Sequence, residues 1–296
     1  MAVLIGIDVG TTNWKVAAFD SDGRMLAIRT TPTQTVTGSD GRPYYDPTTV
    51  WETVAGLLRQ VAEDPAVQGT VDAVAVTGMG EAVVPVDSAG QPVGPVVPWF
   101  DVRSVHQADR IRTELGEEAI FRITGLECNA IFTLSKIAWI KEEQPDVYSR
   151  AATWLPVVDY VNLKLSGCRV TDYTEASRTL MLDLNTNDWS DEMLAVAGGR
   201  RSSLPDIIGS STPLGTITEE AVALTGLPKE THVIMGGHDH LCGSLAAGAL
   251  LGHRILDSSG TAESFVGFSE PGQRPPATFE GLRLGRYMDP DRWVTW

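Results

Sequence analysis

Two apolar runs of strand length open the chain, at Val3–Ile7 and Trp14–Phe19, and a short polar segment separates them. Apolar runs joined by a tight polar turn that contains glycine are typical of a β-hairpin. A third run, Met25–Thr31, follows the turn Ser21-Asp-Gly23 and predicts a third strand. The chain is therefore predicted to begin with three strands.

Helical spacing appears next. Asp46 fits an N-cap, and Pro47 falls in the first turn, where its missing N–H costs nothing. The apolar residues at positions 50, 54, 57, 58 and 61 then form one stripe along a helix. The following run, Val71–Val76, is typical of a strand that is covered on both faces. A helix is thus expected between the third strand and this fourth one.

Strands and helices alternate along the rest of the chain. Val83–Val86 and Pro95–Trp99 flank a turn at Asp87–Gly90 and predict a second hairpin. Further elements are expected as helices at 105–115, 133–143, 160–165, 190–198 and 241–251, as strands at 232–236, 254–258 and 263–268, and as loops at 33–45 and 209–216. This alternation indicates an α/β architecture, and the opening hairpins indicate a mixed sheet flanked by helices.

Composition narrows the class of protein. The chain has 296 residues, enough for about two domains, and a net charge of -15. An acidic chain is a poor partner for nucleic acid or for an anionic membrane surface. The start shows no signal-peptide pattern, and no apolar run has membrane-spanning length. Because the cysteines at 128, 168 and 242 are odd in number and far apart, we expect no disulfide framework and a reduced, cytoplasmic setting.

The first turn, Asp8–Asn13, has chemistry that suits phosphate groups. Gly10 lets the backbone approach a ligand closely, and the amides and hydroxyls of Thr11, Thr12 and Asn13 can converge on anionic oxygens. Asp8 could hold a hydrated divalent cation, and Lys15 could add positive charge. The alternative is an ordinary polar hairpin turn.

A second stretch of interest is Met235–Gly243, in which two glycines precede Asp239 at the start of a helix of small residues. A carboxylate there can accept a proton from a substrate hydroxyl within hydrogen-bond reach. The alternative is that Asp239 only caps the helix. His238 and His240 flank it, and we interpret them as hydrogen-bonded or substrate-facing histidines rather than as zinc or iron ligands.

A third stretch, Asp257–Glu263, repeats the chemistry of the opening hairpin. Gly260 frees the backbone, while Ser259 and Thr261 supply donors. Two such hairpins facing each other across a cleft would hold the phosphates of a nucleotide from both sides. A plain hairpin turn is again the alternative.

Seven stretches, in order, resemble the FGGY carbohydrate kinases, which include xylulokinases, glycerol kinases, gluconokinases and fuculokinases. They are Gly6-Ile-Asp-Val-Gly-Thr-Thr-Asn-Trp-Lys15, Thr77-Gly-Met-Gly-Glu81, Trp99-Phe-Asp-Val-Arg103, Lys136-Ile-Ala-Trp139, Thr171-Asp-Tyr-Thr-Glu-Ala-Ser-Arg-Thr179, Gly236-Gly-His-Asp-His240 and Ser259-Gly-Thr-Ala-Glu263. The resemblance covers essentially the whole chain. It implies the actin-like ATPase (ribonuclease H-like) fold, with ATP and Mg²⁺ as cofactors and a small-molecule sugar or polyol as substrate.

The resemblance also implies roles for particular residues. Asp239 matches the catalytic base, and Asp8 matches the carboxylate near the magnesium. The remaining positions fall into two groups, which are the ATP-phosphate contacts Thr11, Thr12, Asn13, Lys15, Gly260 and Thr261, and the substrate contacts Gly80, Glu81, Asp101 and His240. Lys136 is expected to be structural.

The chain differs from members of the family at substrate positions and in length. Glycerol kinases carry an arginine where this chain has Gly80 and a tyrosine where it has Ile131, which argues against glycerol. Xylulokinases usually have a Gln-Met-His-Gly turn where this chain has Gly78–Ala82, so the sequence does not assign xylulose as the substrate either.

Members of the family are also longer than this chain. We therefore expect a substrate-binding domain at 1–247 and the beginning of a nucleotide-binding domain at 248–296, with an incomplete second lobe and association, for example as a homodimer.

Three functions remain open from the sequence. The leading one is an ATP-dependent sugar or polyol kinase. A second is a non-catalytic sugar-binding or regulatory protein that lacks the adenine subsite. The third is an actin-like or Hsp70-like protein of the same superfamily, which the sugar-site motif at 78–81 and the Gly-Gly-His-Asp stretch disfavour.

Overall fold

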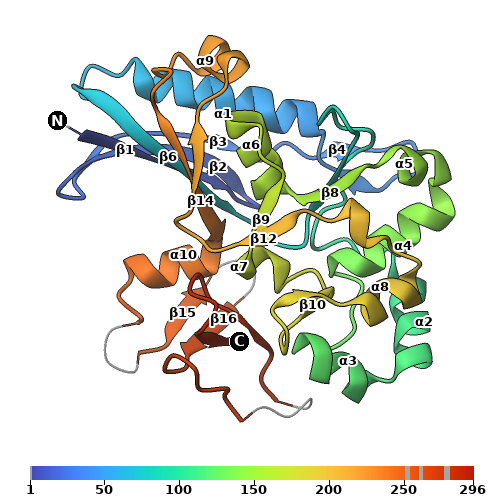
Figure 1. Cartoon of the computed structure of the whole chain (residues 1–296). Helices are drawn as coiled ribbons and strands as arrows, with labels where there is room; N and C mark the ends of the chain where they lie inside the picture. The colour runs from blue at the N-terminus through green and yellow to red at the C-terminus, as the bar shows by residue number, and fades with distance from the viewer. Residues whose placement is uncertain (1, 251–253, 260–262, 277–280) are drawn as a thin grey trace.

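A six-stranded mixed sheet is the centre of the fold (Figure 1). The computed structural model describes residues 2–250, 254–259, 263–276 and 281–296. The strand order is β13-β14-β6-β1-β2-β3. The strands span Ala2–Val9 (β1), Asn13–Asp20 (β2), Met25–Pro32 (β3), Thr70–Gly78 (β6), Pro213–Thr216 (β13) and His232–His238 (β14). Strands β1, β6 and β14 run parallel, whereas β2, β3 and β13 are antiparallel to their neighbours. The mixed α/β architecture is therefore as predicted.

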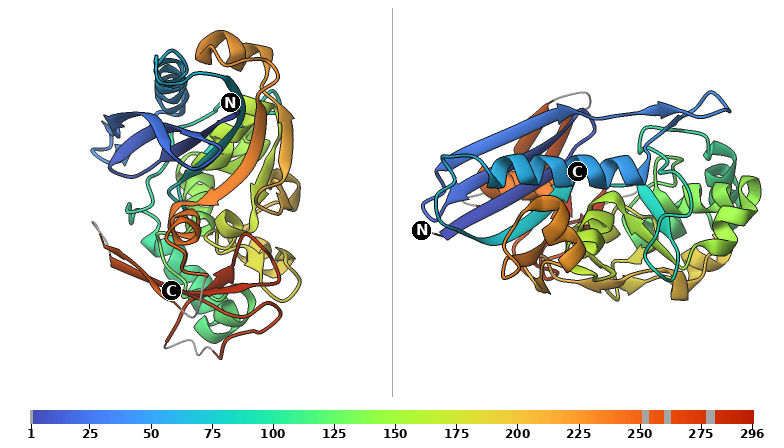
Figure 2. Two further views of the ribbon diagram at one scale, coloured as in Figure 1. Left: turned by 90° about the vertical axis from the view of Figure 1, so that its left-hand side faces the viewer. Right: turned by 90° about the horizontal axis from the view of Figure 1, so that it is seen from above.

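Helix α1 (Pro47–Ala62) covers one face of this sheet (Figures 1 and 2). Asp46 caps it as predicted, because its side chain accepts a hydrogen bond from the Thr48 amide at 3.1 Å. Helices α6 (Val157–Ser166) and α9 (Glu219–Thr225) lie beside α1 on the same face. The loop expected at 209–216 contains the edge strand β13.

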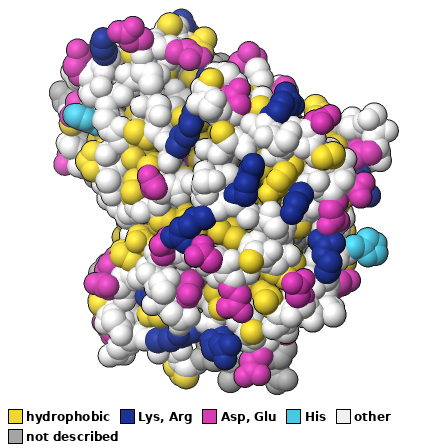
Figure 3. Space-filling model, turned by 45° about the vertical axis from the view of Figure 1, so that its right-hand side comes forward, with side chains coloured by type: hydrophobic (Ala, Val, Ile, Leu, Met, Phe, Trp, Pro, Cys, Tyr) yellow, Lys and Arg dark blue, Asp and Glu magenta, His cyan; other side chains and the backbone are white. Residues whose placement is uncertain are grey.

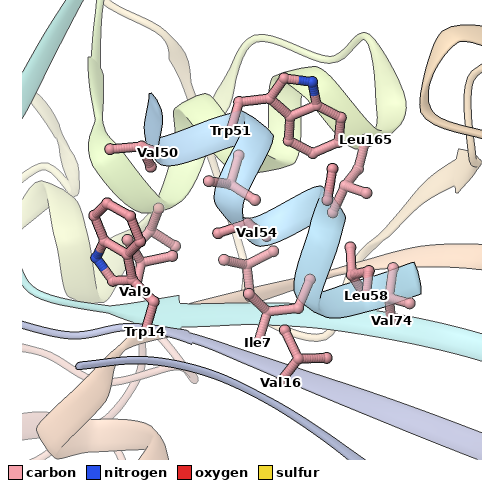
Figure 4. Close-up of a cluster of buried hydrophobic side chains, with 14 of the residues drawn as sticks. Ile7, Val9, Trp14, Val16, Val50, Trp51, Val54, Leu58, Val74 and Leu165 are labelled. Carbon is pink, nitrogen blue, oxygen red and sulfur yellow. The ribbon is translucent and has the colours of Figure 1, made fainter. Parts of the chain in front are cut away.

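Alternation along β1 and β2 decides which side chains enter the core. Odd positions of β1 and even positions of β2 are buried, and Figure 4 shows them meeting one stripe of α1. The side chains labelled in the figure are Ile7, Val9, Trp14, Val16, Val50, Trp51, Val54, Leu58, Val74 and Leu165. Each large apolar side chain buried there contributes roughly 1.5–3 kcal/mol to stability.

The opposite face of the first three strands is less covered. Leu4, Met25 and Ile28 are 45%, 54% and 44% exposed. The pairing of Leu4 with Phe19 and of Phe19 with Met25 places them on the same face as Asp8. On the molecular face in Figure 3, acidic and basic side chains are interspersed. No helix in the described part of the chain is both long enough and apolar enough to cross a bilayer.

A second hydrophobic cluster lies among the helices that follow β6 in the chain. Its buried members include Phe132, Leu134 and Trp154. Its main elements are β7 (Val83–Val86), α2 (Val105–Leu115), α3 (Glu117–Thr124), α4 (Thr133–Glu143), α5 (Pro145–Arg150), β8 (Thr153–Pro156) and α8 (Asp191–Ala197). Short elements connect them, namely β4 (Val36–Thr37), β5 (Pro43–Tyr44), β9 (Val170–Asp172), α7 (Tyr173–Ala176), β10 (Leu182–Asp183), β11 (Asp188–Trp189), η1 (Arg201–Ser203) and β12 (Asp206–Ile208).

The predicted second hairpin is present only in part. Strand β7 pairs along its length with β8, whereas the segment after the turn meets β7 at two isolated antiparallel bridges, Val86 with Pro92 and Val83 with Val97. The segment 91–98 contains Pro92, Pro95 and Pro98, and proline has no N–H to donate to a ladder. The expected loop at 33–45 similarly contains the two-residue strands β4 and β5.

Residues after α10 (Asp239–Ala246) build a separate four-stranded sheet. It consists of β15 (Leu256–Ser259), β16 (Glu263–Phe268), β17 (Leu284–Arg286) and β18 (Trp293–Thr295) in the order β15-β16-β18-β17. Leu284 and Trp293 nevertheless pack into the helical cluster, so contacts cross the predicted boundary at 247/248. That boundary stays a prediction. The helix expected at 241–251 ends at Ala246, and residues 247–250 form a turn.

Two glycines allow the central parallel strands to come close at one end. A Cβ on Gly236 of β14 would lie 1.9 Å from the Val76 carbonyl oxygen, and one on Gly78 of β6 would lie 2.6 Å from that of Val9. Both would collide with main-chain atoms of the neighbouring strand, which cannot rotate away. The close approach of these strands therefore requires glycine at both positions.

We predict that Gly236→Ala lowers the free energy of unfolding by about 3 kcal/mol, because overpacking against backbone forces the strands apart. Gly6→Ala in β1 is the matched control, since a Cβ there meets nothing within 4 Å. Urea unfolding monitored by circular dichroism compares the two. Equal midpoints for both variants would contradict the packing argument.

Candidate active site

Three parallel strands end at one level, and this places three chain segments side by side. Val9 of β1 and His238 of β14 are both register partners of Gly78 in β6. Beyond these ends lie the turn that opens the first hairpin, the segment 79–82 and the start of α10. In open α/β sheets, ligands bind in the crevice outside the carboxyl ends of the strands. This edge is thus the expected position of a site.

A cleft of about 390 Å³ lies at this edge. The four-stranded sheet contributes Arg283 and Trp296 to its wall, together with Ser258, Glu263 and Ser264. The other lining residues are Asp8, Gly10, Thr11, Thr12, Asn13, Lys15, Met79, Gly80, Glu81, Trp99, Ile131, Arg178, His238, Asp239 and His240. The structure therefore brings together nine of the residues singled out in the sequence, which are Asp8, Thr11, Thr12, Asn13, Lys15, Gly80, Glu81, Asp239 and His240.

Asp239 is the first residue of α10 and keeps 31% of its side chain exposed to the cleft. Its Oδ1 accepts a hydrogen bond from the His240 amide at 2.7 Å and lies 3.1 Å from His238 Nδ1. Burial raises the pKa of Asp239 to about 7, and the carboxylates of Asp8 and Glu81 act in the same direction. The group can therefore exchange a proton near neutral pH.

The histidines beside Asp239 are held in the neutral form. Burial and the nearby Arg178 guanidinium place the pKa of His238 well below its ordinary value, and they lower that of His240. His238 Nδ1 also accepts from the His240 amide at 3.3 Å and so caps α10. The Trp296 ring lies 5.3 Å from the His238 ring. Within the described residues, no group of three or more His, Cys, Asp or Glu side chains could hold a metal ion.

The first hairpin presents an ion pair to the cleft. Asp8 and Lys15 are cross-strand partners, and Lys15 Nζ donates to Asp8 Oδ2 at 2.8 Å. A Cβ on Gly10 would lie 2.8 Å from the Asn13 carbonyl oxygen, which explains why this turn requires glycine. The Thr11 hydroxyl accepts a hydrogen bond from Trp99 Nε1 at 2.8 Å, so the turn is tied to the far wall.

Glu81 is paired with an arginine that the sequence analysis did not single out. Arg178 Nε donates to Glu81 Oε1 at 2.7 Å, and Arg178 is 7% exposed. Among the described residues, its Nη1 has no hydrogen-bond partner. A Cβ on Gly80 would meet the His238 ring at 2.7 Å and Arg178 Cβ at 3.3 Å. The signal was present, because Arg178 belongs to the Thr171–Thr179 stretch.

Among the described residues, the predicted site residue Asp101 does not line the cleft. It is buried, and Arg103 Nε and Nη2 donate to its two oxygens at 2.8 Å each. Gly260 and Thr261 fall outside the described residues. Their neighbours Ser258 and Glu263 do line the cleft.

A layer of buried acids supports β14 from behind. Asp172 caps α7 by accepting from the amides of Thr174 and Glu175, and a Cβ on Gly237 would lie 2.8 Å from Asp172 Oδ2. The pKa values of Glu175 and Asp159 are raised well above their ordinary range, primarily by complete burial. Burial therefore disfavours the charged form of both groups.

The class of protein follows from the fold, the cleft and a family comparison. Residues 3–246 match the family model described as "FGGY family of carbohydrate kinases, N-terminal domain". The chain belongs to this family, as its motifs predicted.

Curated relatives agree with that assignment. Xylulose kinase of Bacillus subtilis (strain 168) is 27% identical over 275 residues, which are 93% of this chain and 55% of the relative. L-fuculokinase of Escherichia coli (strain K12) is 28% identical over 263 residues, which are 88% of this chain and 55% of the relative. The chain thus spans about half the length of the curated relatives it matches.

Solved structures define the fold. The crystal structure of xylulose kinase from Rhodospirillum rubrum matches with a TM-score of 0.91 and 27% identity, over 99% of this chain and 59% of that chain. Gluconate kinase from Lactobacillus acidophilus matches with a TM-score of 0.90 and 21% identity, over 99% and 59%, and supports the fold alone. The fold is that of the actin-like ATPases, which confirms the prediction.

We predict that Asp159→Asn changes the pH dependence of stability. The folded protein keeps a proton on Asp159 that the unfolded chain releases above about pH 4. Wild-type stability therefore falls as pH rises, until the raised folded-state pKa is reached. The variant lacks this slope, so its free energy of unfolding gains about 1.4 kcal/mol per pH unit relative to wild type within that window.

Urea unfolding at several pH values between 4 and 9 measures this difference. Asp72→Asn is the control, because Asp72 is exposed and removing a solvated charge changes little. A difference between Asp159→Asn and wild type that does not vary with pH would contradict the prediction.

Proposed function

We propose that the intact protein is an ATP-dependent carbohydrate kinase and that this chain binds a small sugar or polyol in the cleft. Asp239 acts as the general base. The observation that carries the proposal is that Asp239, whose pKa is raised to about 7, shares one cleft with the hairpin Asp8–Lys15 and with Glu81. Phosphoryl transfer needs chiefly positioning and charge neutralisation, and a cleft of this kind supplies both.

The base acts through its outer oxygen. Within the described residues, all recorded contacts of the Asp239 carboxylate involve Oδ1. Oδ2 therefore accepts the proton of the substrate hydroxyl, and the resulting oxygen attacks the γ-phosphorus of ATP. General-base catalysis of this type contributes about 10²–10⁴-fold to a rate.

An acceptor and a donor at the substrate end suit an uncharged sugar. Glu81 can accept hydrogen bonds from sugar hydroxyl groups. Arg178 balances the negative charge of Glu81, so the pair offers hydrogen bonds to an uncharged sugar without adding net charge to the cleft. His240 completes this end of the cleft, with Gly80 leaving space for the His238 ring. Asp101 supports the same end through Arg103. With Gly80 and Ile131 in the cleft wall, glycerol is not the expected substrate.

The hairpin holds the phosphate end. Thr11, Thr12, Asn13 and Lys15 bind ATP phosphates, and Gly260 and Thr261 supply the second phosphate loop. The donor set near Asp8 fits Mg²⁺, which keeps several waters and takes only one or two protein carboxylates. When bound there, Mg²⁺ neutralises phosphate charge.

Residues 1–247 form the substrate-binding domain, and 248–296 begin the nucleotide-binding domain. The free cysteines accord with a cytoplasmic location, and homodimer formation is proposed from the exposed apolar strand face.

We predict that Asp239→Asn in the intact protein lowers kcat by about 10²–10⁴-fold while sugar affinity changes less than about threefold, because the amide cannot take the proton. Xylulose, fuculose, gluconate and glycerol form the first substrate panel, since relatives named for these compounds were matched. Steady-state kinetics and calorimetry separate the two effects. In the wild type, kcat should rise with pH through about 7, where Asp239 loses its proton.

Two outcomes would refute this function. Retained turnover in Asp239→Asn would remove Asp239 from the chemistry. Sugar binding by the wild type without any binding of ATP would support the alternative, a non-catalytic sugar-binding protein.

We predict that Asp8→Ala weakens binding of Mg²⁺–ATP about tenfold and leaves sugar affinity unchanged, since it removes one charged group from the proposed phosphate end. Isothermal titration with ATP in the presence and absence of Mg²⁺ measures the effect. Asp22→Ala, in an exposed turn of the same hairpin unit, is the control. Unchanged Mg²⁺–ATP affinity would argue against a metal role for Asp8.

A further inference from the structure

Glu81 has an unusual main-chain conformation for a side chain that faces the cleft. Its φ is 61°, in the left-handed region. A non-glycine residue in this region costs roughly 1–2 kcal/mol, so surrounding contacts must hold it there. Because the side chain leaves the backbone in a direction set by φ, the placement of the carboxylate depends on those contacts.

Lys136 makes the contact to the Glu81 main chain. It lies in α4, is 0% exposed, and its Nζ donates to the Glu81 carbonyl oxygen at 3.0 Å. Lysine is almost never fully buried without a partner, because an ammonium group loses its hydration there. Burial lowers the pKa of Lys136 to about 7, while the carboxylates of Glu81 and Asp101 oppose the shift and the Arg103 charge adds to it.

The start of α4 also fixes the second cation that holds Glu81. The Leu134 amide donates to the Thr179 carbonyl at 2.9 Å, directly beside Arg178 in the chain. The Phe132 ring lies 5.3 Å from the Arg178 guanidinium. The beginning of α4 therefore positions both Lys136, which donates to the Glu81 carbonyl oxygen, and Arg178, which donates to the Glu81 carboxylate.

We propose that Lys136 is a positioning residue for the substrate, which holds Glu81 in its left-handed conformation so that the carboxylate faces the sugar. This inference rests on the proposed kinase function. It assigns a role to a lysine that the sequence analysis interpreted as structural. Lys136 does not line the cleft, so it acts through Glu81 and contacts neither the sugar nor ATP.

A merely structural role predicts a different result on substitution. Removing one partner of a buried polar contact costs some stability in either case, because the Glu81 carbonyl loses its donor. A positioning lysine replaced by methionine therefore weakens sugar binding selectively, while kcat and KM for ATP are kept. A structural lysine would instead affect all functions together.

The experiment compares Lys136→Met with wild type in the intact protein, using the compound of the substrate panel with the highest kcat/KM. We expect KM for the sugar to rise about 10- to 100-fold, as for loss of a charge-assisted hydrogen bond. We expect kcat and KM for ATP to stay within about threefold, and the melting temperature to fall no further than the loss of one buried hydrogen bond requires. Lys136→Gln, which keeps a donor, should recover most of the affinity.

Lys141→Met is the matched control, because it removes a partly exposed lysine from the same helix that contacts the Gly198 carbonyl instead. It should leave KM for the sugar unchanged. In a double-mutant cycle, Lys136→Met should add little in a Glu81→Ala background, since Lys136 acts on the sugar only through the Glu81 carboxylate, which that background lacks. Additive effects in this cycle would overturn the inference.

Other outcomes are equally decisive. An unchanged KM for the sugar in Lys136→Met overturns the inference while leaving the kinase function intact. A Lys136→Met protein that does not fold shows a structural lysine and also overturns it. If the wild type phosphorylates no sugar, the proposed function fails. The crystal structure of Lys136→Met then still tests the positioning, because a left-handed Glu81 in the variant would contradict it.

Discussion

The common level at which β1, β6 and β14 end is the constraint on which the site depends. Hydrogen bonding places Val9, Gly78 and His238 in one row, and Gly78 and Gly236 permit the strands to approach because they carry no side chain. The hairpin turn, the segment around Glu81 and the start of α10 then emerge at a single edge. A slip of one residue in either pairing would turn the side chains of a strand to the opposite face and separate these segments.

Charge compensation distinguishes three of the carboxylates that line the cleft, those of Asp8, Glu81 and Asp239. Asp8 has Lys15 at 2.8 Å and Glu81 has Arg178 at 2.7 Å, so each carries a cation within hydrogen-bond distance. Within the described residues, the recorded close neighbours of Asp239 are the His240 amide and the neutral imidazoles of His238 and His240. Groups whose environments differ in this way take different parts in acid–base chemistry. Behind β14, burial raises the pKa values of Glu175 and Asp159.

Local patterns predicted much of the fold and of the site. The Asp46 cap and the first hairpin are encoded within a few residues, and the turn residues Thr11 to Asn13 lie next to the strands that place them. The pairing of β7 with β8 and the contacts of Glu81 were missed because they are non-local. Arg178 lies 97 residues and Lys136 lies 55 residues from Glu81 in sequence, and no periodicity links positions so far apart. The three prolines in 91–98 did carry a local signal against a strand.

The packing of Gly80 against His238 couples the side chains that these two positions can hold. The His238 ring fills the volume that a side chain at 80 would need, with Cδ2 only 2.7 Å from the site of a Cβ. A descendant that acquires a larger residue at 80 must therefore first shrink or reorient residue 238, which immediately precedes Asp239. A change of substrate through position 80 would therefore also disturb the residue next to the proposed base. Substitutions elsewhere in the cleft wall, such as at Ile131, do not carry this constraint.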